Sequence, residues 1–186
     1  MCCRFAINET VITWLKQFQP NVQLTSLGDI SPTNHAPVLV AGHDGPLVTS
    51  MAWGFTRQDK QLVINARSET AWEKPLFREA MFRSRCVLPA AWFYEWDQQK
   101  RKNTFFAADG GILFLAGMFN EAERFVILTT AADTVMRPVH DRMPVCIQDA
   151  VTMDWLFDAD KAQAILGQKG ASLQRSKSME QCSLFD

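Results

Sequence analysis

Short runs of apolar and β-branched residues follow one another through the middle of this chain, and they constrain its fold more than any other feature. They occupy residues 38–40, 47–53, 62–64, 86–88, 92–96, 104–107, 112–119 and 125–130. His43-Asp44-Gly45 and Asp109-Gly110-Gly111 supply turn residues between consecutive runs. Short strands at this spacing, with little helix between them, favour antiparallel pairing. We therefore predict an α+β fold that consists mainly of an antiparallel, barrel-like β-sheet with a few peripheral helices.

Helical patterns are confined to three places. Residues 10–18 follow the capping residue Asn8, place apolar residues at helical spacing and end before Pro20. One or two helical turns fit residues 76–81, and a final helix fits residues 149–166. From Gly167 onward the chain is polar. We therefore predict one domain over residues 1–166 and a flexible tail over residues 167–186.

Length and composition restrict the functions that are open to the chain. A chain of 186 residues builds one sizeable core, and its formal net charge is −1. A protein that binds nucleic acid through phosphate attraction alone is basic, so DNA binding would need a local patch of arginines.

The spacing of cysteines and histidines indicates a reducing compartment and argues against a metal site. The five cysteines lack CxxC spacing, the three histidines lack ligand spacing, and no apolar signal or membrane-spanning run is present. We therefore expect reduced thiols in the cytoplasm, no metal, no cofactor and no contact with a membrane.

The chain starts Met1-Cys2-Cys3-Arg4-Phe5. If Met1 is removed, Cys2 carries a free α-amine and a thiol on adjacent carbons. The amine condenses with an aldehyde, and the thiol then closes on the imine to form a five-membered thiazolidine. Both groups titrate near neutrality, at roughly 7.7–8.0 for the amine and about 8.5 for the thiol. A cysteine at position 2 can also occur by chance after the start codon. Further motifs must therefore decide whether Cys2 is functional.

Four such motifs follow in order: Asn-Ala-Arg-Ser-Glu-Thr at 65–70, Arg-Cys-Val-Leu-Pro-Ala at 85–90, Phe-Tyr-Glu-Trp at 93–96 and His-Asp-Arg-Met-Pro at 140–144. With the Cys-x-Arg-Phe start, this series resembles the SOS-response-associated peptidase (SRAP) family of abasic-site-processing proteins, from Cys2 to about Trp155. The resemblance implies that Cys2 becomes covalently linked to the ring-opened aldehyde of an abasic site in single-stranded DNA. We further expect a monomer in the cytoplasm, associated with the nucleoid.

The resemblance assigns four catalytic residues. Cys2 is the nucleophile, and Glu95 exchanges protons with the Cys2 amine and the sugar oxygen. His140 changes charge near neutral pH and protonates the sugar ring oxygen, while Asn65 orients the amine or the sugar through its amide. The last three have plainer alternatives: a Glu95 that points to water, a structural His140, and an Asn65 that satisfies backbone groups.

The same resemblance indicates a DNA-binding set. Arg4, Arg67 and Arg142 are candidates for phosphate contacts because a guanidinium matches two phosphate oxygens, with surface charge as the alternative. Trp53 and Phe55 are candidates for stacking on bases, with core packing as the alternative. Arg78, Arg83 and Arg85 are additional candidates for the basic patch.

Several positions depart from the family pattern. Cys3 replaces the usual glycine, and Asp29 places a negative charge where the family has a neutral amide. Ala91-Trp92 stands where Asp-Gly is usual. These departures leave the catalytic set intact and concern the grip on DNA.

The last residues contain a separate motif. Gln181-Cys182-Ser183-Leu184-Phe185 resembles the peptide by which bacterial repair proteins dock on the β sliding clamp. Leu184 and Phe185 would fill an apolar pocket, and Gln181 would bind its rim. The alternative is a chance pentapeptide at the chain end.

Two other functions fit the N-terminal cysteine. An N-terminal-nucleophile amidohydrolase uses the thiol to attack an amide, but it does not predict the motifs at 65–70 and 140–144. A non-catalytic module that reads single-stranded or modified DNA would bind equally well with Cys2 replaced.

Overall fold

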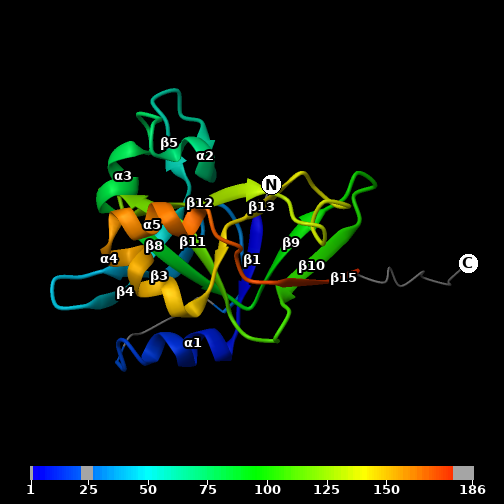
Figure 1. Cartoon of the computed structure of the whole chain (residues 1–186), viewed down its shortest axis with the longest axis horizontal. Helices are drawn as coiled ribbons and strands as arrows, with labels where there is room; N and C mark the ends of the chain where they lie inside the picture. Colours follow the sequence, from blue (N-terminus) through cyan, green and yellow to red (C-terminus); the bar gives the residue numbers. More distant parts are fainter. Residues whose placement is uncertain (1, 22–26, 178–186) are drawn as a thin grey trace, which may run out of the picture.

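A closed ring of strands forms the centre of the computed structural model, which describes residues 2–21 and 27–177 (Figure 1). In ring order the strands are β3 (His35–Ala41), β4 (Pro46–Trp53), β12 (Arg124–Ala131), β11 (Leu113–Asn120) and β8 (Arg85–Ala90), which pairs back to β3. The β4–β12 pair is parallel and the other four pairs are antiparallel. The predicted barrel-like, mainly antiparallel sheet is therefore confirmed.

A second antiparallel sheet packs against this ring. Its strand order is β15 (Leu173–Lys177), β10 (Lys102–Ala107), β9 (Trp92–Trp96), β1 (Arg4–Ile7) and β2 (Gly28–Ile30). Alternate residues of the three central strands point inward, so Phe5, Phe93 and Phe105 are fully buried. The ring of Phe5 lies 5.3 Å from that of Trp53 in β4, which joins the two sheets in one core.

β15 contradicts the predicted flexible tail. Residues 173–177 pair with β10 in an antiparallel register, and the Leu173 side chain is buried opposite Ala107. The Ala171 amide also donates to the Cys146 carbonyl. The prediction that flexibility begins at Gly167 is therefore wrong for this strand. The sequence does not reveal the strand because backbone hydrogen bonds hold it and Leu173 is its only apolar residue.

The helices lie outside the sheets. α1 (Glu9–Lys16) begins where the Asn8 side chain accepts a hydrogen bond from the Val11 amide, as the sequence predicts. The expected final helix is instead a 3₁₀ turn (Asp149–Val151), α4 (Thr152–Phe157) and α5 (Ala159–Leu166). Asp158 interrupts it because its carboxylate accepts from the Asp160 and Lys161 amides and so caps a new helix.

Short elements beside the ring bring distant motifs together. They are β5 (Phe55–Thr56), β6 (Leu62–Val63), β7 (Asn65–Arg67), α2 (Ser68–Ala71), α3 (Arg78–Arg83), β13 (Arg142–Pro144) and β14 (Cys146–Ile147). β7 runs parallel to β12, and β13 pairs with the following residues of β12. The motifs at 65–70 and 140–144 therefore meet across β12. No helix in the described ranges has the length and apolarity needed to cross a membrane.

Candidate active site

Cys2 lies directly before β1 and is fully buried. Its Sγ is 3.8 Å from the Arg4 carbonyl oxygen. Burial, and secondly the negative charge of Glu95, raises the pKa of the Cys2 thiol far above its usual range. The thiol is therefore protonated at neutral pH, and its reaction needs a group that takes up the proton.

Asn65 begins β7 and lies beside Cys2. Its Nδ2 donates a hydrogen bond of 2.8 Å to the Cys2 carbonyl oxygen. Its Oδ1 is buried and has no hydrogen-bond partner in the described part of the chain. A buried acceptor without a donor costs about 1–3 kcal/mol. One side of the Asn65 amide thus holds the Cys2 backbone, and the other side is ready to accept a donor.

Glu95 comes from the middle of β9, where the strand alternation turns it away from Tyr94 and Trp96. It is 5% exposed, so a Glu95 that points to water is excluded. Its charge raises the thiol pKa of both Cys2 and Cys3, although burial contributes more to each shift. Glu95 therefore acts electrostatically on the N-terminal cysteines.

His140 lies in the loop that leads into β13. Its Nδ1 is 3.0 Å from the Arg142 amide nitrogen and 2.8 Å from Asp141 Oδ1. One nitrogen cannot accept from an amide and donate to a carboxylate at once, so the first contact requires an Nδ1 without a proton and the second an Nδ1–H. Cys2, Asn65 and Glu95 form one cluster, whereas these His140 contacts are within its own motif.

Arg142 binds other residues of the protein. Its guanidinium meets Glu69 with N–O distances of 2.7 and 2.8 Å, and Nη2 also donates to the Thr129 carbonyl oxygen. This contact lowers the pKa of Glu69. The fork that was expected to bind a phosphate instead joins β13 to α2 and β12, so the structure gives Arg142 a structural role.

Trp53 and Arg85 are also internal. Trp53 is fully buried, donates from Nε1 to the Ile64 carbonyl oxygen and stacks on Phe125. Phe55 is 2% exposed and Arg85 is 4% exposed. The predictions that Trp53 and Phe55 stack on bases, and that Arg85 widens the basic patch, are therefore wrong.

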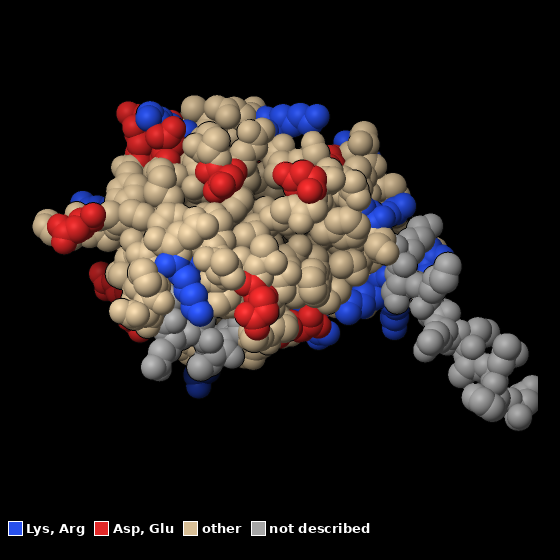
Figure 2. Space-filling view, turned by 90° about the horizontal axis from the view of Figure 1, so that it is seen from below, with Lys and Arg blue, Asp and Glu red and all other residues tan. Residues whose placement is uncertain are grey.

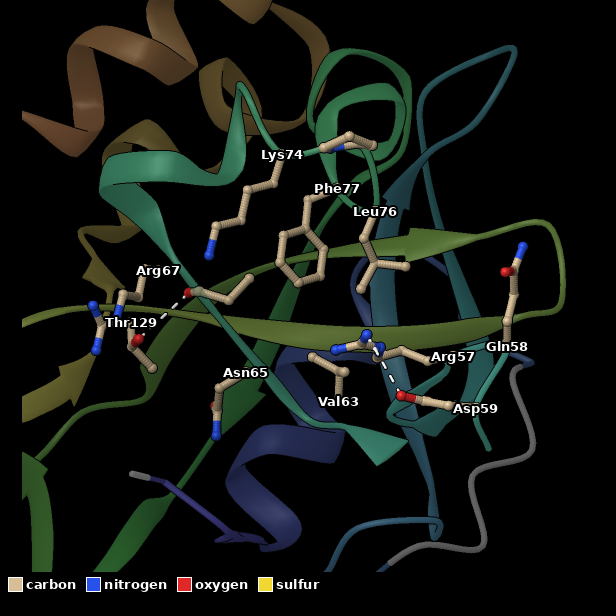
Figure 3. Close-up of a pocket in the computed structure, with 12 residues that line it drawn as sticks. Arg57, Gln58, Asp59, Val63, Asn65, Arg67, Lys74, Leu76, Phe77 and Thr129 are labelled. Carbon is tan, nitrogen blue, oxygen red and sulfur yellow. Dashed lines mark hydrogen bonds and ion pairs between the residues drawn. The ribbon is translucent and has the colours of Figure 1, made fainter. Parts of the chain in front are cut away.

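An open pocket of about 860 Å³ extends from Asn65 (Figure 3). Cationic side chains line it together with an apolar wall: Arg57, Arg67, Lys74, Val63, Leu76 and Phe77. Arg57 pairs with Asp59, while Arg67 and Lys74 form no ion pair within the described residues. In Figure 3, Lys74, Phe77 and Leu76 face Asn65 and Val63 across the pocket. Cations beside apolar surface fit a phosphodiester and its sugar.

Lys74 and Leu76 were missed from the sequence. They lie in the segment between α2 and α3, shortly after the motif at 65–70. Leu76 begins the helical turns predicted at 76–81, and nothing in that pattern distinguishes a pocket residue from a core residue. Leu76 is 43% exposed, and its place in the pocket wall is known only from the structure.

Arg4 remains near the surface. Its Nη1 is 3.9 Å from Asp29 Oδ2, and the two side chains are 41% and 40% exposed. An exposed pair of this kind contributes little, so Arg4 keeps the capacity to bind a phosphate. In Figure 2, Lys and Arg side chains gather toward the end with β9, β10 and β15, while most of that face is uncharged.

Some expectations fall outside these observations. Gln181, Leu184 and Phe185 lie outside the described residues. Within residues 2–21 and 27–177, no three His, Cys, Asp or Glu side chains form a group that could hold a metal ion.

Comparisons with known proteins agree on one family. The family model described as "SOS response associated peptidase (SRAP)" matches residues 1–181. The abasic site processing protein YoqW of Bacillus subtilis (strain 168) is 30% identical over 89% of this chain and 86% of its own length. The abasic site processing protein YedK of Escherichia coli (strain K12) is 29% identical over 95% of this chain and 86% of its own length.

Solved structures share the fold. A crystal structure of a protein from Bordetella bronchiseptica has a TM-score of 0.79 at 23% identity and covers 96% of this chain and 100% of that one. A second, from Bacteroides thetaiotaomicron, has a TM-score of 0.76 at 18% identity, with 96% and 93% covered.

Proposed function

Because this chain belongs to the SOS response associated peptidase (SRAP) family, we propose that it processes abasic sites in single-stranded DNA through a covalent bond to Cys2. The observation that carries the proposal is the contact of Asn65 with the Cys2 carbonyl, beside the buried Glu95 and at the edge of a cationic pocket. The names of the relatives YoqW and YedK support the choice of substrate.

The reaction begins once Met1 is removed. The Cys2 amine attacks the C1′ aldehyde of the ring-opened sugar and forms an imine with loss of one water. The Cys2 sulfur then adds to the imine carbon, and the thiol proton moves to the nitrogen. A C–N and a C–S bond have formed, no oxidant or reductant is consumed, and the product is a thiazolidine that shields the lesion.

The neighbouring residues move protons and hold the reactants. Glu95 takes a proton from the ammonium group of Cys2 and passes one to the departing hydroxyl. Asn65 fixes the Cys2 backbone through Nδ2 and offers Oδ1 to the amine or a sugar hydroxyl. His140 acts as the general acid that protonates the sugar ring oxygen as the ring opens, a role that histidine often fills.

The pocket binds the extruded sugar-phosphate. Arg67 and Lys74 neutralise the flanking phosphates, and the wall of Leu76 and Phe77 covers the sugar where a base is missing. An abasic site leaves empty space where the base would be, and the apolar side chains of this wall would fill that space.

A denaturing gel with single-stranded DNA that holds one abasic site tests the covalent step. We expect a slow-migrating adduct with the mature protein and none with Cys2→Ala. Cys3→Ala is the matched control, since it removes the neighbouring thiol, which has no α-amine beside it, and should crosslink. Cys2→Ser should give at most an imine that needs reduction to survive.

The same assay separates the competing functions. If Cys2→Ala forms the adduct as well as the wild type, the proposal is wrong. Glutamine hydrolysis that depends on Cys2 would instead favour an N-terminal-nucleophile amidohydrolase. Lesion binding that is unchanged in Cys2→Ala, without any adduct, would favour a non-covalent binding module.

A further inference from the structure

We propose that α3 carries a second single-stranded DNA subsite, formed by Phe82, Arg78 and Arg83, which holds the strand as it leaves the pocket beside Asn65. This inference rests on the proposed function, because it extends the path of the same DNA strand. It concerns residues that do not touch the Cys2 cluster.

Two hollows adjoin along the segment that leads into α3. The second hollow has a volume of about 510 Å³ and is lined by Pro75, Arg78, Glu79, Phe82 and Arg83. Pro75 also lines the pocket beside Asn65. Figure 1 places α2 and α3 together at the end of the molecule opposite α1. A strand that crosses Pro75 therefore passes directly from one hollow into the other.

Phe82 is the aromatic group of this second hollow. It is 51% exposed although its side chain is large and apolar. The Trp72 ring meets it edge-on at 5.0 Å and supports it from inside. A supported and half-exposed ring offers a face to a nucleobase, and such stacking requires no particular base sequence.

The charges around Phe82 favour an anionic partner. Arg78 and Arg83 are exposed, and neither forms an ion pair within the described residues. Glu79 is the single acidic residue that lines the hollow. An apolar protein segment would leave both guanidinium groups unmatched, whereas the phosphates on either side of a stacked base match them.

Non-covalent binding tests the subsite apart from the chemistry. The probes are oligonucleotides that contain one tetrahydrofuran abasic analogue, which has no aldehyde, and that are lengthened stepwise on the 5′ or the 3′ side. We expect longer probes to bind the wild type more tightly on one side only. Phe82→Ala should lose roughly 5- to 150-fold of affinity for the long probe, and none for the shortest.

Matched variants control for surface changes. Phe157→Ala removes a phenylalanine that is 49% exposed and lines neither hollow, and it should bind like the wild type. Arg78→Gln with Arg83→Gln should flatten the logarithmic salt dependence by about 1.4, at roughly 0.7 per phosphate. Lys16→Gln with Lys169→Gln removes two exposed cations elsewhere and should leave the slope unchanged.

Four outcomes would overturn a proposal. If lengthening has no effect on either side, or if the gain survives in both α3 variants, the α3 subsite is wrong and the proposed function stands. Equal losses in Phe82→Ala and Phe157→Ala also reject the subsite. A wild-type protein that binds no probe of any length contradicts the proposed function itself.

Discussion

Replacement of the buried Arg85 should destabilise the fold strongly. Its guanidinium donates to four carbonyl oxygens, at 2.6 Å to Trp155, 2.7 Å to Met81, 3.0 Å to Phe82 and 3.2 Å to Leu156. These carbonyls belong to the last turns of α3 and α4, where helices lack internal partners and favour a cation. Arg85 thus joins both helix ends to β8.

The size of the loss follows from two opposing terms. Hydrogen bonds from a charged donor contribute about 1.5–3 kcal/mol each, which would give about 6–12 kcal/mol for four. Burial of the guanidinium opposes this and lowers the pKa of Arg85. For Arg85→Ala we expect a net loss of about 3–5 kcal/mol, in the range measured when one partner of a buried charged network is removed.

Urea unfolding followed by circular dichroism measures this loss. For a chain of this size the melting temperature should also fall by about 6–20 °C, at roughly 2–4 °C per kcal/mol. Arg83→Ala is the control, because Arg83 is an exposed arginine two positions away, and it should change stability by less than about 0.5 kcal/mol. A loss below about 1 kcal/mol for Arg85→Ala would refute the reasoning.

Three further predictions concern charge, pH and the chain end. Asp29→Asn removes the carboxylate 3.9 Å from Arg4, so affinity for single-stranded DNA should rise roughly two- to fivefold, and Arg4→Ala should cancel the gain in a fluorescence titration. Burial raises the pKa of the Cys146 thiol to about 12. Below the unfolded-state thiol pKa of about 8.5 this shift leaves the stability of the fold unaffected; as the pH rises from there toward 12, it lowers the free energy of unfolding by up to about 1.4 kcal/mol per pH unit. Urea unfolding of Cys146→Ala should therefore show a flatter decline of stability with pH than the wild type, and an identical slope would contradict the prediction. We also expect a peptide of residues 176–186 to bind purified β sliding clamp in a calorimetric titration, and to lose binding when Leu184 and Phe185 are both replaced by alanine; binding that ignores these changes rejects the clamp motif.

Strand spacing predicted the sheet well, because alternation and turn residues are local signals. The closure of the ring has no such local signal in the sequence. It depends on the parallel pairing of Arg124–Phe125 with Ala52–Trp53, and no spacing rule specifies which distant strands meet. β15 escaped prediction for a related reason, since a polar strand at a sheet edge is held by backbone bonds that any sequence can make.

The site divides in the same way. Ordered motifs identified Cys2, Asn65 and Glu95, which the structure brings into one cluster. They did not predict that the guanidinium of Arg142 pairs with a carboxylate, because its partner Glu69 lies 73 positions away in the sequence. They also misplaced Trp53, since an aromatic residue in a strand has the same appearance whether it faces the core or a base.

The mass of the N-terminal adduct tests the covalent proposal most directly. The protein is incubated with single-stranded DNA that holds one abasic site, digested with nuclease and protease, and analysed by mass spectrometry. We predict a peptide that begins at Cys2, lacks Met1, and carries the sugar remnant with the loss of one water, with fragment ions that place the remnant on Cys2. A peptide that retains Met1 while the DNA remnant is attached, or a remnant on any other residue, would contradict the thiazolidine at Cys2.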